Sequence, residues 1–226
     1  SDVCSSDLLS KLPLADVPYT SSMQLFLFLT ALMFLPFVMF MMTSFVRIVI
    51  SLSFLKSALG AQQAIPSQIL VGLAIVLTIF IMRPVLNEIN EKALQPYMKE
   101  EVTMEEAMKE AEGPIKEFLL KQTRQTDLDL FVEQAGLKEK KLTRENIPLS
   151  VVVPAFAISE LKTAFQIGFL IYIPFLIIDL VVASVLMSMG MFMLPPVMIS
   201  LPFKLLLFVM VDGWNLIVKT LILGFG

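Results

Sequence analysis

Residues Ala164 to Met187 read AFQIGFLIYIPFLIIDLVVASVLM, and this stretch decides the class of fold. Asp179 is the only charged residue in it. A helix needs about 20 mainly apolar residues to cross the hydrocarbon core of a membrane. The stretch is long enough to do so, and we therefore expect a helix that is surrounded by membrane rather than by water.

Three further apolar runs flank this stretch. Met23 to Met42 carries no charge, Ile69 to Met82 is shorter, and Pro195 to Ile222 carries three charged residues. Over 226 residues, 57% of side chains are apolar and the mean hydropathy is +0.81, values that exclude an ordinary soluble domain. The sequence predicts an all-α membrane protein with four long, hydrophobic helices in two hairpins. Pro36 and Pro202 predict kinks in the first and fourth of them.

A charged segment separates the two pairs of apolar runs. Residues 83–162 hold twelve of the seventeen Lys and Arg and fifteen of the twenty Asp and Glu. Thr103 and Glu106 fit a capping box, in which each residue satisfies the other's backbone amide at a helix start. We expect Pro114 to begin a second helix and Thr126 a third. The segment is therefore predicted to be a water-facing insert of amphipathic helices.

These patterns divide the chain into four parts. Residues 1–22 are expected to be an N-terminal extension, and Ser1 to Leu8 match nothing around them, which suggests a non-native end. The first hydrophobic hairpin is assigned to 23–86, the extramembrane insert to 87–157, and the second hairpin to 158–226.

The orientation follows from two basic residues. Thr43 to Gln68 is predicted to be a loop, and it carries Arg47 and Lys56 but no acid, which favours the cytoplasmic side. We interpret Arg47 as a membrane anchor whose charged end reaches the interface. Four crossings then place the insert on the outer side.

Several classes of site are excluded by composition. The chain has no histidine, which removes Ser–His and Cys–His nucleophile pairs and the common zinc hydrolase motifs. Cys4 is the only cysteine, so no intramolecular disulfide forms. We expect no catalytic residue, metal, cofactor or nucleic-acid partner.

Charged side chains in or beside the apolar runs need an explanation, because they are costly in a membrane and usually face a partner or water. Asp179 lies in mid-helix, and Lys204 and Asp212 share one side of the predicted fourth helix. They form either a polar seam between subunits or along a conduit, or an ion pair within one hairpin. Glu160 and Lys162, at the start of the third helix, either reach water or join such contacts.

Methionines gather where the third and fourth helices meet. Met187, Met189, Met191 and Met193 alternate around Gly190 and precede a proline pair. Thioether side chains are flexible and polarizable, so they serve either as apolar filler or as a surface that deforms and reseals. Several copies of such a loop around an axis form an apolar ring, and hydrophobic constrictions close pores.

Four motifs carry a resemblance to a known family. They are MTSFVRIVI at Met42 to Ile50, ALGAQQ at Ala58 to Gln63, SELKTAFQIG at Ser159 to Gly168, and IPFLIIDLVVASVLMSMGM at Ile173 to Met191. Over about Lys11 to Phe225 the chain resembles the FliP family, the flagellar branch of the type III export-gate family.

The resemblance implies a non-enzymatic, pore-forming subunit that passes unfolded flagellar proteins across the bacterial inner membrane at the basal body. It implies a ring-forming homo-oligomer of about five copies with FliQ and FliR, adjacent to FlhB and FlhA, and a periplasm-facing insert. The family's hydrophobic hairpins pack on other subunits rather than spanning the bilayer singly.

The resemblance also assigns a gasket to this chain. It corresponds to Met191, Phe192 and Met193, with Met189 beside them, and Phe192 departs from the three consecutive methionines of many members. On the residues alone, a small ion channel or secondary transporter that uses Asp179 remains the alternative.

Overall fold

The structure is a computed structural model that describes residues 26, 28–30, 32–34, 40–61, 65–137 and 146–225. The chain divides into two compact units, Ser1–Met39 and Phe40–Gly226, and the helices below belong to the second. Half of the predicted first apolar helix, Met23 to Met42, lies outside the described residues.

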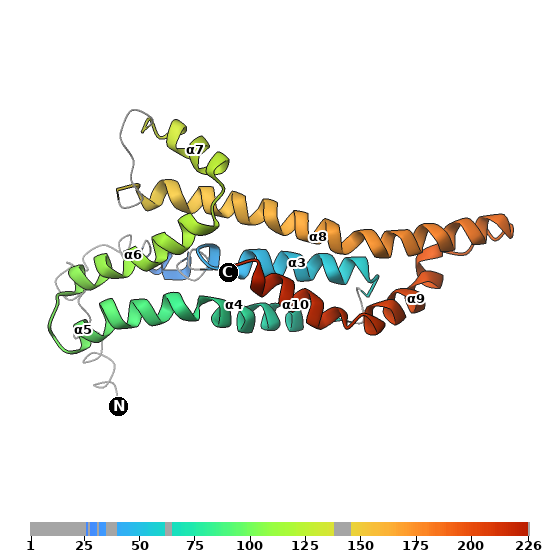
Figure 1. The fold of residues 1–226 in the computed structure, drawn as a ribbon, viewed down its shortest axis with the longest axis horizontal. Helices are drawn as coiled ribbons and strands as arrows, with labels where there is room; N and C mark the ends of the chain where they lie inside the picture. Colours follow the sequence, from blue (N-terminus) through green and yellow to red (C-terminus); the bar gives the residue numbers. More distant parts are fainter. Residues whose placement is uncertain are drawn as a thin grey trace. The chain divides into compact units, whose positions relative to one another are not determined.

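The second unit is built from helices throughout its described residues, as predicted. In chain order they are α3 (Phe45–Ala58), α4 (Ser67–Ile89), the π-helix η1 (Asn90–Leu94), α5 (Gln95–Met98), α6 (Met104–Gln122), α7 (Gln125–Gln134), α8 (Leu149–Ser188), α9 (Pro196–Met210) and α10 (Gly213–Leu223). Figure 1 shows α3 between α8 and α4, and α3 packs against both. The end of α10 returns to the start of α3 (Figure 1).

The membrane character expected from the sequence is confirmed by the lengths of these helices. Ser67–Met98 and Leu149–Ser188 are each long and apolar enough to cross a membrane. Helices α9 and α10 are long and apolar enough for a third crossing only when taken together as one span, and they are bent by 63° at their break.

The bend in the C-terminal segment lies at Asp212 rather than at the predicted Pro202, which is inside α9. Asp212 adopts a left-handed backbone conformation with φ of 50°. The next residue, Gly213, allows the ring of Phe208 to lie against the backbone, because a Cβ there would be 2.2 Å from that ring. Close packing at a glycine therefore fixes the bend.

The prediction of a loop from Thr43 to Gln68 is wrong, because α3 occupies most of that range. Serines interrupt its apolar pattern, which hides the helix from a search for long apolar runs. Ile48, Leu52 and Leu55 nevertheless recur at helical spacing, and all three are buried in the core.

Two other helix boundaries also differ from the predictions. α6 continues through Pro114, which is buried together with Phe118 and Leu119, and packing on this shared face carries the helix past the proline. α8 begins at Leu149 rather than near Ala164, because its first turns are already apolar and buried in the core.

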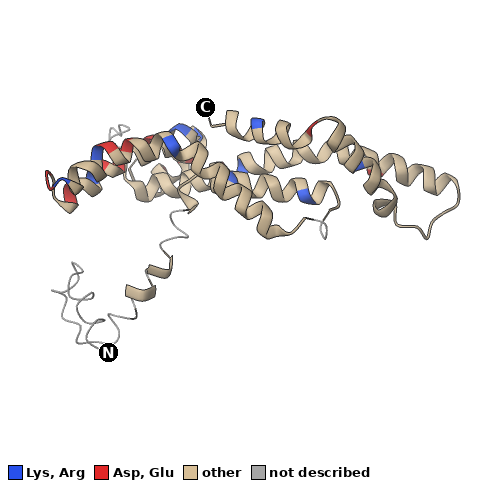
Figure 2. Ribbon diagram, turned by 90° about the horizontal axis from the view of Figure 1, so that it is seen from below, with Lys and Arg blue, Asp and Glu red and all other residues tan. Residues whose placement is uncertain are grey.

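The charged side chains concentrate on α6, whereas α8, α9 and α10 carry few (Figure 2). α6 packs against α8, α4 and η1, and α7 packs along α8. The insert is therefore attached to the apolar helices rather than folded around a separate core.

The predicted capping box at the start of α6 is confirmed. The Thr103 amide donates a hydrogen bond of 2.8 Å to Glu106 Oε2, and the Glu106 amide donates one of 3.3 Å to Thr103 Oγ1. The hydrogen bond from the Thr103 backbone, followed by that from its hydroxyl, lowers the pKa of Glu106 below its ordinary value.

We predict that the first turn of α6 loosens in acid. A lowered folded-state pKa contributes stability that is present above the ordinary Glu pKa and is lost as the pH falls through the lowered value. Amide protection of that turn, measured by hydrogen exchange and corrected for intrinsic rates, should fall over this range. Glu106→Gln should remove the pH dependence, and Glu105→Gln, one residue earlier and outside the box, should keep it. Equal effects of the two variants would contradict this account.

Helices α3 and α8 approach closely at Gly168. A Cβ at this position would lie 2.5 Å from ring carbons of Phe54 and 2.9 Å from its Cβ, so the backbone of α3 would have to shift. The Phe54 ring in turn packs edge-on against Phe165 at 5.2 Å between centroids.

We predict opposite effects of alanine at two helical glycines. Gly168→Ala should lower the free energy of unfolding by about 1–3 kcal/mol through overpacking. Gly72→Ala should raise it by about 0.5–1 kcal/mol, because a Cβ there meets nothing within 4 Å and alanine favours the helix. Denaturant titration of the purified chain in detergent measures both, and equal effects at the two sites would refute the close approach.

Candidate functional site

A buried ion pair joins α3 to α8. Arg47 Nε donates a hydrogen bond of 2.9 Å to Glu160 Oε2, and a second guanidinium nitrogen contacts Oε1, so the pair is bidentate. Arg47 is 3% exposed and Glu160 is 0% exposed. An unpaired charge at such a depth is strongly destabilising, so each group requires the other.

Arg47 also holds the end of the chain and the insert. Its Nη1 donates a hydrogen bond of 2.8 Å to the carbonyl of Gly224, and its Nη2 donates one of 3.1 Å to Gln122 Oε1. The side-chain amide of Gln122 donates a hydrogen bond of 3.2 Å to the carbonyl of Phe225. The centroid of the Phe225 ring lies 3.8 Å from the guanidinium carbon of Arg47. One guanidinium therefore connects α3, α6, α8 and the end of α10.

These contacts correct two interpretations of the sequence. Arg47 is not a membrane anchor that reaches the interface, because its guanidinium is enclosed by protein. Glu160 does not reach water, whereas Lys162 is exposed. Nothing local marks Gln122 as a member of this cluster, since it follows a weak apolar face and precedes a turn.

A second ion pair closes the α8–α9 hairpin. Lys204 is 2% exposed. Its Nζ donates a hydrogen bond of 2.6 Å to Asp179 Oδ2 and one of 3.1 Å to the carbonyl of Ala58, at the end of α3. Ser200, also buried, donates its hydroxyl proton to Asp179 Oδ1. Of the two interpretations left open by the sequence, the structure shows the ion pair within one hairpin.

Asp212 takes no part in this pair. The predicted fourth helix is broken at Val211, so Asp212 does not share a helix face with Lys204, and its side chain is exposed at the bend. Its left-handed backbone conformation marks it as a residue of the bend.

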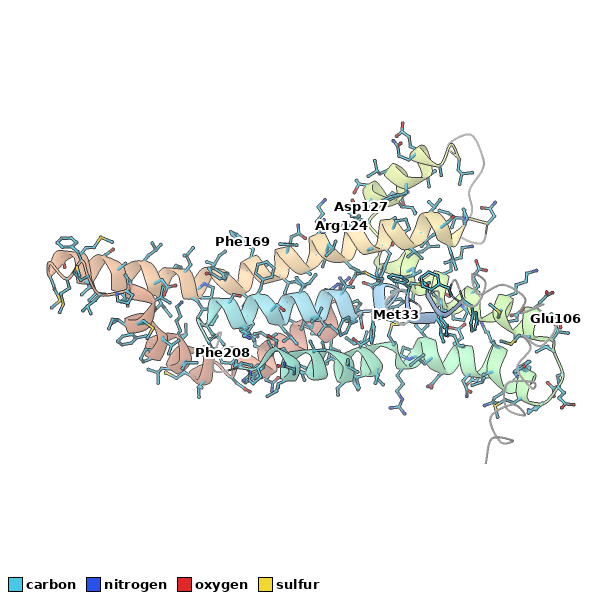
Figure 3. All side chains as sticks on the ribbon, turned by 180° about the vertical axis from the view of Figure 1, so that it is seen from behind. Met33, Glu106, Arg124, Asp127, Phe169 and Phe208 are labelled. Carbon is cyan, nitrogen blue, oxygen red and sulfur yellow. The ribbon has the colours of Figure 1, made fainter. Side chains whose placement is uncertain are left out.

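A third polar contact attaches α7 to α8. The backbone amide of Arg124 donates a hydrogen bond of 3.1 Å to Ser159 Oγ, and the Ser159 hydroxyl donates one of 2.7 Å to Asp127 Oδ2. The Arg124 guanidinium also reaches Gln166. Figure 3 shows Arg124 and Asp127 together where α7 meets α8. Nothing in the sequence marks these residues as partners, because the contacts join residues 32 to 42 positions apart.

The methionine-rich segment is the tip of the α8–α9 hairpin. Gly190 has a φ of 75°. Its amide donates a hydrogen bond of 3.0 Å to the carbonyl of Met187, and the Met191 amide donates one of 2.9 Å to the carbonyl of Leu186. This is the Schellman pattern that ends a helix, and glycine at the left-handed position makes it favourable. The tip therefore begins with a defined turn.

Side chains at the tip face outward. Phe192 is 78% exposed and Met193 is 97% exposed, and Met189 and Met191 are also exposed. Further exposed apolar side chains follow α8 and α9, among them Phe169, which projects from α8 on the side away from α3 (Figure 3). In the most apolar window of α8, 11% of the residues are buried within the chain. Such a surface is stable only in lipid or against other protein.

The profile of the FliP family matches residues 28–221. The chain belongs to the FliP family. The flagellar biosynthetic protein FliP of Bacillus subtilis (strain 168) is 59% identical over 91% of this chain and 93% of its own length. The proteins of the same name from Pectobacterium carotovorum subsp. carotovorum and Aquifex aeolicus (strain VF5) are 52% and 51% identical, over 95% and 89% of this chain and 83% and 84% of their own lengths.

We predict that the Arg47–Glu160 pair dominates the stability of this FliP-family fold. Glu160→Ala should lower the free energy of unfolding by about 3–5 kcal/mol, because it leaves a buried, unpaired guanidinium. Lys162→Ala, two residues further on and exposed, should change it by less than about 0.5 kcal/mol. Denaturant titration in detergent measures both, and a Glu160→Ala effect no larger than that of Lys162→Ala would contradict this assignment.

Proposed function

We propose that this chain is a structural, pore-forming subunit of the flagellar type III protein export gate in the bacterial inner membrane. In this role several copies, about five, surround a conduit together with FliQ and FliR, next to FlhB and FlhA. Unfolded flagellar proteins pass through the conduit, and the insert faces the periplasm. Family membership and the names of the relatives support the flagellar assignment.

The observation that carries the pore-forming role is the exposed α8–α9 hairpin. Asp179 and Lys204 neutralise each other within the chain, and beyond Lys162 the exposed side chains of the hairpin are mainly apolar. Such a hairpin satisfies its own polar groups and requires an apolar environment, which neighbouring subunits in a ring supply.

The tip of the hairpin suits a gasket. Met189, Met191, Phe192 and Met193 have few contacts within the chain, so symmetry-related copies can meet through them. Flexible thioethers adapt to a passing polypeptide and close again behind it. Phe192 has fewer rotatable bonds than methionine, and it stiffens the seal.

A transporter that uses Asp179 is the second candidate, and the contacts of this carboxylate disfavour it. One oxygen accepts from Lys204 and the other from Ser200. A transporter carboxylate must bind and release its ion repeatedly, so its oxygens cannot both be occupied by hydrogen-bond donors of the protein.

Deleting Met191 to Met193 tests the gasket. The deletion should leave assembly intact and make membranes permeable to ions, because the apolar constriction is lost. Whole-cell ion leak and secretion of flagellar proteins measure this, with the exposed Met98→Ala, on α5, as a control that should change neither. Unchanged leak and secretion in the deletion would refute the gasket.

Asp179→Asn separates the two candidates. If Asp179 is structural, the substitution should weaken the hairpin, and assembly and secretion should fall together, since Lys204 loses its counter-charge. A transporter would instead lose transport while its assembly stayed intact. Mass measurement of the complex co-purified with FliQ and FliR reports assembly, and a stable monomer of the unaltered chain would contradict the ring.

A further inference from the structure

A row of polar side chains follows the exposed face of α10. Asp212, at the start of the helix, Asn215 and Lys219 are three and four residues apart, so they lie on one side of it. All three are exposed, and all three line one open hollow of about 560 Å³. The opposite side of α10, with Ile217 and Leu221, is buried in the chain. The row therefore faces away from the core.

The position of this row in an apolar segment needs an explanation. Taken together, α9 and α10 are long and apolar enough to cross a membrane. Lys204, one of the three charged residues in this part of the chain, is buried in an ion pair. The other two, Asp212 and Lys219, are exposed on one face. Charged side chains are costly against lipid and usually face water, a partner or a transported substrate. Lipid is therefore an unfavourable neighbour for this face of α10.

A contact between the rows of two copies is also unfavourable. The copies in a closed ring are related by rotation about one axis, so corresponding residues lie at the same height along it. Asp212 of one copy then lies level with Asp212 of the next, and Lys219 lies level with Lys219. Like charges that are brought together in an interface oppose association. The exposed apolar side chains of α8 and α9, such as Phe169 and Val209, provide better contacts between copies.

Water is the environment that suits this row. Around a ring axis, Asp212 and Lys219 form two rings of charge about 10 Å apart along α10. Rings of charged side chains line the water-filled paths of channels. Because each copy contributes one acid, one amide and one base, the row has no net charge. It therefore offers hydrogen-bond donors and acceptors to a passing polypeptide without selecting it by the sign of its charge.

We propose that Asp212, Asn215 and Lys219 line the aqueous conduit and contact the unfolded polypeptide that passes through it. This inference rests on the proposed export role and adds to it the face of the chain that meets the substrate. Since α9 leads from the methionine tip to α10 (Figure 1), one continuous segment supplies both the apolar seal and, beyond the bend at Asp212, a polar wall.

The test uses the full chain in secreting cells and a flagellar protein that stalls in the conduit, because its end is fused to a domain that does not unfold. The stalled protein carries cysteines along the segment that fills the conduit, and a bismaleimide joins two thiols that lie close together. All variants of the chain are made in a Cys4→Ser background. Asn215→Cys and Lys219→Cys should cross-link to the stalled protein, as should Met193→Cys at the tip. The matched control is Leu216→Cys, which is exposed and directly follows Asn215 but lies off the polar row, and it should not cross-link.

Three outcomes would overturn the proposal. Leu216→Cys could cross-link as efficiently as Asn215→Cys, which would remove the distinction between the row and the rest of α10. Cross-linking at Met193→Cys alone would place the row outside the conduit and leave the export role intact. Cross-links between two copies of Asn215→Cys that stay undiminished when the stalled protein fills the conduit would assign the row to a subunit interface.

A failure of the export role itself gives a different result. If the stalled protein blocks secretion but cross-links at none of these positions, Met193→Cys included, the proposed conduit is contradicted together with this inference. Asn215→Cys replaces an exposed, uncharged side chain, so the test does not depend on whether a variant that removes a charge folds.

Discussion

The arrangement of the helices depends on the buried pair of Arg47 and Glu160. A guanidinium and a carboxylate taken out of water are tolerated only when they meet each other and their remaining hydrogen bonds are filled. Arg47 meets this requirement with the carbonyl of Gly224 and the amide oxygen of Gln122. Since these partners come from α6, α8 and the end of α10, satisfying one cation of α3 fixes the relative positions of all four helices.

The same rule operates at the other end of α3. Lys204 reaches both Asp179 and the carbonyl of Ala58, so the α8–α9 hairpin is closed and joined to α3 by one ammonium group. Arg47 and Lys204 thus neutralise the carboxylates of Glu160 and Asp179 within the chain. Beyond the exposed Lys162, the outer surface of the hairpin can then be mainly apolar, and the methionine tip extends from a segment in which Asp179 and Lys204 are paired.

The sequence predicted the parts of this structure that depend on local chemistry. Long apolar runs identified α4 and α8, and Thr103 with Glu106 identified the start of α6. It did not predict α3, because Ser51, Ser53 and Ser57 interrupt the apolar pattern of that helix. Nor could it pair Arg47 with Glu160, which lies 113 residues away, since nothing local to either residue marks a long-range partner. The bend at Asp212 depends on the close contact of Phe208 with Gly213, which the apolar pattern of that run does not reveal.

In the proposed function, the tip of the hairpin lines the conduit of the assembled gate. Met193→Cys in a Cys4→Ser background places a single thiol at that tip, and a bulky charged thiol reagent can then be added to secreting cells. We expect the reagent to stop secretion of flagellar proteins in Met193→Cys and to leave it unchanged in Met98→Cys, an exposed position on α5. Labelled Met193→Cys that still secretes at the normal rate would contradict the claim.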